Sequence, residues 1–174
     1  METADVLVRP ARESDLDGWL DLYEAVATEG RWIGGELPID RQEQRRKFLE
    51  GFVERKSPAA ALIAVSGEVP AGHLFLTTRR GIGEIGMAVD HAWRNRGVGT
   101  ALMAAAVDWA RAQGLHKVTL QLWPHNVAAR RLYDKFGFVE EGYLRRHYRR
   151  RNGELWDAVV MGLVLDTTSP GSPL

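Results

Sequence analysis

The sequence contains no cysteine, and its 23 Lys and Arg residues are balanced by 23 Asp and Glu residues. The lack of cysteine excludes disulfide bonds, thiolate metal sites and a cysteine nucleophile, and it fits a cytoplasmic protein. Because neither sign of charge is in excess, the composition predicts no nucleic acid and no membrane surface as a partner. The first residues lack the basic and apolar regions of a signal peptide, and no apolar run approaches the length of a membrane span.

The chain has 174 residues, and we expect a single domain over residues 1–166. Residues 167–174 are rich in Ser, Pro and Gly, which predicts a disordered tail. The order of apolar patterns and turn residues predicts a mixed α/β (α+β) fold with one central sheet flanked by helices. Ser14 is predicted to cap a first helix with Leu16, Trp19, Leu20 and Tyr23 on its apolar side, and a second helix is predicted from Asp40 to about Val53. The other predicted elements are a strand at 6–8, strands at 60–65, 71–77 and 85–89, a helix at 101–112, a strand at 118–123, a helix that Asn126 caps and that stops at Gly137, and a hairpin of strands at 138–148 and 155–165.

Residues 94–100, with the sequence Arg-Asn-Arg-Gly-Val-Gly-Thr, lie between a predicted strand and a predicted helix. The first N–H groups of a helix have no partner within the helix, and the helix dipole is positive at that end. Gly97 and Gly99 lack a Cβ, so that a phosphate can approach the backbone, and Arg94 and Arg96 are expected to add mobile positive charge. The stretch therefore predicts a binding site for a diphosphate.

A second glycine pattern, residues 81–86, matches G-x-G-x-x-G but stands in the wrong place for a dinucleotide site. A dinucleotide fingerprint follows a strand and opens a helix, whereas this pattern leads into the strand at 85–89. A Walker A loop is excluded because no Lys followed by Ser or Thr comes after the last glycine.

The remaining pattern, Arg-x-x-Gly-x-Gly followed by a small residue and a helix, resembles the acetyl-CoA signature of the GNAT family of N-acetyltransferases. Residues 126–138, Asn-Val-Ala-Ala-Arg-Arg-Leu-Tyr-Asp-Lys-Phe-Gly-Phe, resemble the second motif of that family, and the spacing of the two motifs also fits. The resemblance covers residues 60–165. It implies a mostly antiparallel sheet in which strands 4 and 5, at 85–89 and 118–123, splay apart in a V.

The same resemblance implies that acetyl-CoA is the co-substrate and that no metal takes part. Its pantetheine arm is expected to lie in the splay and to pair with free backbone groups near Met87 and Val89, like an added strand. Asn126, Arg130 and Tyr133 are spaced to share one helix face. The residues expected to bind the co-substrate are Met87, Ala88, Val89, Arg94, Asn95, Arg96, Gly97, Val98, Gly99, Thr100, Asn126, Ala129 and Tyr133.

Acetyl transfer to an amine requires a base for the ammonium proton and an acid for the departing sulfur. Tyr133 is the predicted acid, and the competing interpretation is a core tyrosine packed under Phe136. Glu84 is the predicted base, although a shift of one residue in register would turn it to the other face of the sheet. His125 is an alternative base. Gln121 stands where other family members carry a glutamate, and an amide is not a base.

The acceptor pocket is expected to draw on residues 28–40 and on the closing hairpin, with Trp32, Glu36 and Tyr148 as candidate substrate-binding residues. An aromatic wall with a carboxylate would suit a cationic amine. The predicted partner is an amine substrate, from a small molecule or a peptide, and the family also suggests a homodimer.

Two other functions remain open at this point. One is a non-catalytic module that binds or senses acyl-CoA and has lost the acceptor chemistry. The other is RNA binding by the basic run at residues 145–151, although a solvated β-ribbon explains that run better.

Overall fold

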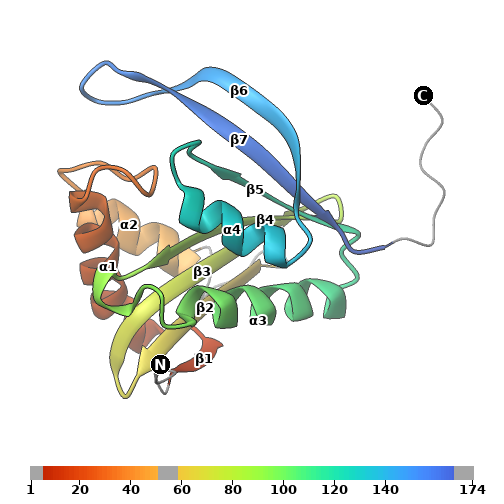
Figure 1. Ribbon diagram of the computed structural model, residues 1–174. Helices are drawn as coiled ribbons and strands as arrows, with labels where there is room; N and C mark the ends of the chain where they lie inside the picture. The colour runs from red at the N-terminus through yellow and green to blue at the C-terminus, as the bar shows by residue number, and fades with distance from the viewer. Residues whose placement is uncertain (1–5, 51–58, 167–174) are drawn as a thin grey trace.

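The computed structural model describes residues 6–50 and 59–166, and the predicted tail at 167–174 lies outside these ranges. A single seven-stranded sheet forms the centre of the molecule, as predicted, with helices on both of its faces (Figure 1). The elements in chain order are β1 (Leu7–Pro10), η1 (Glu13–Asp15), α1 (Leu16–Thr28), α2 (Arg41–Phe48), β2 (Ala59–Ser66), β3 (Val69–Arg79), β4 (Ile82–Val89), η3 (His91–Trp93), α3 (Val98–Ala112), β5 (Lys117–Leu122), α4 (Val127–Lys135), β6 (Val139–Arg149) and β7 (Leu155–Val164).

The strand order in the sheet is β1-β2-β3-β4-β5-β7-β6. Every neighbouring pair is antiparallel except β4 and β5, which run parallel. The parallel pairing begins at Ile82 and Lys117 and ends at Ile85 and Leu120, so the last residues of β4 have no strand beside them on that edge. This is the V-shaped splay that the family resemblance implied.

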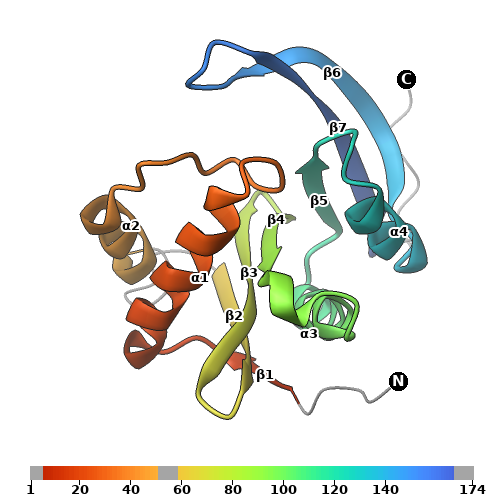
Figure 2. The ribbon, with the colours of Figure 1, turned by 60° about the vertical axis from the view of Figure 1, so that its left-hand side comes forward.

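The helices divide between the two faces of the sheet, with α1 and α2 on one side and α3 and α4 on the other (Figure 2). The larger core lies under α3, where Leu102, Met103 and Ala106 have no exposed surface. A smaller core lies under α1, where Leu16, Trp19 and Leu20 pack with Phe48 of α2, as the apolar side of the predicted helix indicated. Removing each such side chain from water contributes roughly 2 kcal/mol to folding.

Side chains along β4 alternate between these two faces. Ile85, Met87 and Val89 belong to the core under α3, whereas Ala88 packs with α1 and with Trp32. The strand therefore contributes to both sides of whatever occupies the splay.

The hairpin of β6 and β7 extends beyond the sheet and arches over the region between α1 and α4 (Figure 2). Its arch depends on a bulge, because the pairing of Leu144 with Ala158 is followed by that of Tyr148 with Trp156. Three residues of β6, 145–147, thus lie opposite Asp157 alone. The carboxylate of Asp157 holds the bulge by accepting hydrogen bonds from the Tyr143 hydroxyl, at 2.7 Å, and from the Arg146 N–H, at 2.6 Å.

One local prediction is wrong: Ser14 does not cap the first helix. A short 3-10 turn, η1, precedes α1, and the Asp15 carboxylate accepts the Arg12 N–H at 2.7 Å. Asp40 does cap α2, since its carboxylate accepts the Glu43 N–H, and Asn126 caps α4 by accepting from the Ala129 N–H. The predicted end of the second helix, near Val53, lies outside the described residues.

Candidate active site

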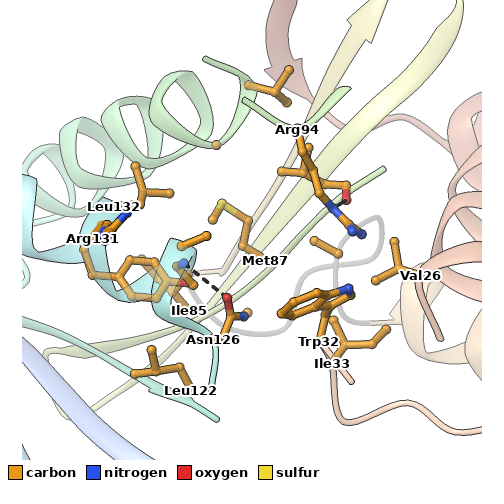
Figure 3. Close-up of a pocket in the computed structure, with 18 of the residues that line it drawn as sticks. Val26, Trp32, Ile33, Ile85, Met87, Arg94, Leu122, Asn126, Arg131 and Leu132 are labelled. Atoms are coloured by element: carbon orange, nitrogen blue, oxygen red, sulfur yellow. Dashed lines mark hydrogen bonds between the residues drawn. The ribbon is translucent and has the colours of Figure 1, made fainter. Parts of the chain in front are cut away.

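A cleft of about 920 Å³ opens where β4 and β5 separate (Figure 3). Its walls come from the loop after α1, the end of β4, the start of α3, the end of β5 and one side of α4. All but one of the predicted donor-binding residues line it: Met87, Ala88, Val89, Arg94, Asn95, Gly97, Val98, Gly99, Thr100, Asn126, Ala129 and Tyr133. The exception is Arg96, which lies outside the lining with its guanidinium carbon 5.6 Å from the centre of the Trp93 ring.

The N-terminus of α3 presents unpaired backbone N–H groups to this cleft. Gly97 precedes the helix with a φ of 83°, a left-handed conformation that glycine adopts without strain. No side chain caps this N-terminal end of the helix. The first bond of the helix runs from the Ala101 N–H to the Gly97 carbonyl. Within the described residues, the N–H groups of Val98, Gly99 and Thr100 therefore have no partner, which is the arrangement that the predicted anion site requires.

The edge of β4 offers further backbone groups along the splay. The Asp90 N–H bonds the Ala71 carbonyl toward β3, and backbone groups alternate in direction along a strand. Val89 and Met87 accordingly direct their N–H and C=O groups toward the open side. An extended ligand arm in the splay can pair with them as a strand would.

Arg94 does not carry the mobile charge that the sequence suggested. Both of its terminal nitrogens bind the carboxylate of Glu29, at 2.7 and 2.5 Å, and its Nε donates to the Val89 carbonyl at 3.1 Å. The paired guanidinium holds the pKa of Glu29 below its ordinary value. In Figure 3 the side chain lies on the side of Val26 and Trp32, across the cleft from Arg131 and Leu132.

Two cations on α4 that the sequence reasoning missed, Arg131 and Lys135, do line the cleft. Neither forms an ion pair with another residue of the described ranges. Leu132, beside them, lies so close to the α3 N-terminus that a Cβ on Gly99 would come within 3.1 Å of it. The i, i+4 spacing of Arg131 and Lys135 was the available signal, because it places both on the face of α4 that carries Leu132.

The predicted common face of Asn126, Arg130 and Tyr133 does not form. Asn126 and Tyr133 line the cleft, but Arg130 turns away and forms an ion pair with Glu140 of β6 at 2.8 Å. Helical spacing gives only the approximate face on which a residue lies. The direction of the Arg130 side chain is set by its ion pair with Glu140 of β6.

Tyr133 is buried in the core and also lines the cleft. The interpretation as a core tyrosine and the interpretation as an acid at the cleft therefore do not exclude each other. The Tyr133 side chain is 6% exposed and packs against Phe138, with ring centres 5.9 Å apart, in the core cluster against which Phe136 also packs. Burial raises the pKa of the Tyr133 phenol to about 12, so the hydroxyl stays protonated at neutral pH.

Glu84 is exposed and lies on the face of β4 that carries Gly86 and Ala88, which is the side of α1. It does not line the cleft itself, but it is near enough to the Tyr148 hydroxyl to raise the pKa of that phenol, after burial, which is the larger cause. Glu84 therefore lies on the α1 side of the sheet, two residues before Gly86, and its role as a base stays a prediction.

Aromatic side chains form the other end of the cleft. Trp32, Trp123 and Tyr148 line it, and the ring of Tyr148 stands edge-on to Trp123 at 5.1 Å. The Tyr148 hydroxyl donates to the Gln121 side-chain oxygen at 2.7 Å, which joins the hairpin to β5. Trp32 and Tyr148 thus line the cleft together with Trp123 and Gln121, and a role for any of them in substrate binding stays a prediction.

Glu36 is not part of this wall. It lies beside a smaller cavity under the loop, where its carboxylate is 3.5 Å from the Arg150 Nε and accepts the Arg151 N–H at 2.9 Å. Arg150 is buried and stacks on Trp156, 4.4 Å from the ring centre. Glu36 therefore lies outside the cleft lining and is paired with Arg150, and this arrangement does not support the prediction that it attracts a cationic amine.

His125 is held by a hydrogen bond from one of its two ring nitrogens. Its Nε2 lies 2.7 Å from the Arg31 carbonyl, which can only accept a hydrogen bond, so Nε2 carries the proton.

Across residues 6–50 and 59–166, no three His, Asp or Glu side chains gather in a way that would hold a metal ion. None of the helices in these ranges is long and apolar enough to cross a membrane.

Comparison with known proteins agrees with this geometry. The model of the "Acetyltransferase (GNAT) family" matches residues 19–138. The chain is 26% identical to the L-amino acid N-acetyltransferase AaaT of Escherichia coli K12, over 92% of this chain and 99% of that protein. It is 32% identical to an aminoglycoside N(6')-acetyltransferase type 1 of Klebsiella aerogenes, over 80% of this chain and 93% of that protein.

Among solved structures, the chain superimposes on yncA, a putative acetyltransferase from Salmonella typhimurium that was solved with its cofactor acetyl-CoA. The TM-score is 0.80 at 19% identity, and the match covers 97% of this chain and 99% of that one. At this identity the likeness establishes a shared fold.

Proposed function

The chain belongs to the acetyltransferase (GNAT) family, and from this premise we propose that it moves the acetyl group of acetyl-CoA to a primary amine of a small molecule or peptide. The transfer is by direct attack while both substrates are bound. The observation that carries the proposal is the single cleft, which joins the unpaired N–H groups of α3 and the Tyr133 hydroxyl to the aromatic wall of Trp32, Trp123 and Tyr148.

The donor would be held in three places along the cleft. Its diphosphate would accept hydrogen bonds from the N–H groups of Val98, Gly99 and Thr100. Its pantetheine arm would pair with the open edge of β4 at Met87 and Val89. Arg131 and Lys135 would meet its phosphorylated nucleoside end, because they are the unpaired cations on the α4 side of the cleft.

In the reaction, the neutral amine nitrogen attacks the thioester carbon, a C–N bond forms and the C–S bond breaks. Glu84 lies on the acceptor face and would take the ammonium proton through water. Tyr133 would donate a hydrogen bond to the sulfur as negative charge develops on it. A thiol, with an ordinary pKa of about 8.5, is a stronger acid than a phenol whose pKa is raised to about 12. Complete transfer of the Tyr133 proton is therefore uphill, and the hydrogen bond itself is the contribution.

The acceptor wall favours an amine with an apolar body over a polycation. It is formed by aromatic and aliphatic side chains, and two carboxylates near it, Glu29 and Glu36, are each paired with an arginine, which leaves Glu84 near Tyr148 as the carboxylate for the proton. The two relatives are named for L-amino acids and for an aminoglycoside. We place this chain with the first, as an acetyltransferase of amino acids with apolar side chains or of similar small amines.

A panel of amines tests the proposal, with thiol release from acetyl-CoA as the measurement. The panel should contain apolar and charged L-amino acids, a polyamine, an aminoglycoside and a short peptide. We expect release to depend on an added amine and to be fastest with apolar L-amino acids. Binding of acetyl-CoA without release for any amine would instead support the non-catalytic acyl-CoA module.

We also propose a cytoplasmic location and a homodimer, neither of which the cleft requires. The location rests on the absence of cysteine. For the dimer, β6 is an edge strand of the sheet, and its exposed Val139 and Tyr143 offer a surface to a second copy. Light scattering coupled to size exclusion would show whether a dimer forms.

A further inference from the structure

Arg94 belongs to the glycine-rich stretch of the donor site, but its contacts connect it to the acceptor wall. Its guanidinium meets the Glu29 carboxylate in a fork, with one oxygen on each terminal nitrogen, at 2.7 and 2.5 Å. Its Nε donates to the Val89 carbonyl at the end of β4. Glu29 directly follows α1, so this ion pair fastens the end of that helix to the end of β4.

Glu29 in turn holds Trp32. The indole Nε1 of Trp32 donates to the Glu29 carboxylate at 2.6 Å, to the same oxygen that Arg94 binds at 2.7 Å. Two cations also lie near the Trp32 ring, with the Arg31 and Arg94 guanidinium carbons 4.5 and 5.6 Å from its centre. Trp32 is thus held at its indole N–H by Glu29 and contacted at its ring by arginines.

The segment that carries Trp32 is anchored across the splay as well. His125, just before the α4 cap Asn126, donates from Nε2 to the Arg31 carbonyl at 2.7 Å. The loop at residues 31–33 therefore bridges the cleft from the β4 side to the α4 side. Arg94 through Glu29 is one support of this bridge, and His125 is the other.

We propose that Arg94 is a positioning residue for the acceptor wall: through Glu29 it fixes Trp32 against the end of β4, and it does not bind the phosphates of the donor. The inference rests on the proposed function, since it assigns Trp32 to the acceptor site. A phosphate that recruited Arg94 would leave the Glu29 carboxylate without its cation partner. The N–H groups of α3 and the cations of α4 already face the donor, so the phosphates do not need Arg94.

The variants Glu29→Gln and Arg94→Gln distinguish a positioning role of Arg94 from a phosphate-binding role, because the second role predicts opposite changes in CoA affinity for the two variants. The titrations that measure this affinity need no acceptor. Calorimetric titration with CoA and with pantetheine should give CoA affinities within about twofold of the wild type for both variants, with an unchanged preference for CoA over pantetheine. If Arg94 bound phosphate, Arg94→Gln would lose about tenfold in CoA affinity alone, and Glu29→Gln would strengthen CoA binding by freeing the arginine. That pair of results would overturn the proposal.

Trp32 itself supplies the second readout, again without an acceptor. In an NMR spectrum, the indole N–H resonance of Trp32 is assigned as the one that is missing in the variant Trp32→Phe. We expect this resonance to shift and to exchange faster with water in both Glu29→Gln and Arg94→Gln, and to stay in place in Arg111→Gln, a matched change at the far end of α3. An unchanged Trp32 resonance in Arg94→Gln would contradict the positioning role.

With an acceptor from the amine panel, the acceptor KM should rise about tenfold in each single variant while the KM for acetyl-CoA stays constant. The double variant should be no worse than either single one, because both residues act through the same contact. A rise in the KM for acetyl-CoA alone would refute the assignment. If no amine of the panel were acetylated, the proposed function would be contradicted. The role of Arg94 would then be decided by the CoA titration and by the Trp32 resonance.

Discussion

The two ends of the cleft are built in opposite ways. The donor end comes from one continuous stretch, β4 through α4, in which a turn, a helix start and a second helix follow each other along the chain. The acceptor end joins distant segments: Arg94 meets Glu29 across 65 residues, and Arg150 meets Gly34 across 116. At the proposed donor end, backbone N–H groups and two α4 cations line the cleft without a partner in the described part of the chain. At the proposed acceptor end, the carboxylates of Glu29 and Glu36 are paired with Arg94 and Arg150.

This difference follows from what each end has to bind. A fixed anionic ligand is served by unpaired positive groups that are rigidly placed, and a helix N-terminus provides these without side chains. An apolar wall must instead keep charges out, which requires that nearby carboxylates and arginines satisfy each other. Substitutions at the two ends should therefore separate, with donor binding affected by one set and acceptor binding by the other.

The largest effect is expected where the two ends meet, at Tyr133. In Tyr133→Phe the ring still fills its place against Phe138, but the hydrogen bond to the departing sulfur is lost. We expect kcat to fall by about 100-fold or more, with little change in the affinity for CoA. Steady-state kinetics and CoA titration measure the two quantities. An unchanged kcat would leave Tyr133 as a core residue only.

At the donor end, Arg131→Ala with Lys135→Ala should weaken binding of CoA by roughly tenfold or more at low salt, because two unpaired cations near its phosphates are removed. Binding of pantetheine, which lacks the phosphates, should not change. The control is Arg130→Ala on the same helix, whose partner is Glu140 rather than the cleft. If Arg130→Ala weakened CoA binding equally, the effect would come from the general charge of α4.

At the acceptor end, Asp157→Ala should raise the acceptor KM by roughly threefold through the hairpin. The carboxylate holds the bulge through two hydrogen bonds, and the bulge sets where Tyr148 reaches Gln121. Tyr143→Phe removes only one of these bonds and should have a smaller effect. The KM for acetyl-CoA should be the same in both variants, and a rise in that value would show that the two ends are not separable.

The smallest expected effect is on the pH dependence of kcat/KM. Because burial raises the pKa of Tyr133 to about 12, its hydroxyl remains protonated from neutral pH up to pH 10. The wild-type pH profile of kcat/KM should therefore rise with deprotonation of the amine and should show no fall below pH 10 from Tyr133. Tyr133→Phe should lower the profile without changing its shape. A fall between pH 8 and 10 that disappears in Tyr133→Phe would assign a lower pKa to this phenol.

Much of the fold was predictable from local patterns. The strands and the helix that Asn126 caps follow from apolar alternation and turn residues. The splay at β4 and β5 was implied by the resemblance to the GNAT family rather than by these patterns. Ser14 failed as a cap because Asp15 and the backbone of Arg12 formed a tighter turn one residue away. The candidate site was predictable where its chemistry lies in the backbone, as at residues 97–100.

Side-chain partners across the sheet were not predictable in the same way. Nothing near Arg94 in the sequence indicates Glu29, and nothing near Glu36 indicates Arg150. The same limit applies to α4, where helical spacing grouped Arg130 with Asn126 and Tyr133 although Glu140 draws it away. Each of these arginines has a pairing that depends on segments brought together only by folding.

The sequence by itself determined the proposed donor end, because unpaired N–H groups arise wherever a glycine turn opens a helix, whatever else the chain does. Tertiary structure alone decided the proposed acceptor end. It paired Glu29 with Arg94 and Glu36 with Arg150, turned Glu84 to the α1 side of the sheet, and left Arg131 and Lys135 without an ion-pair partner among residues 6–50 and 59–166. Charge at a site depends on which opposite charges lie within a few ångströms, and long-range packing sets those distances.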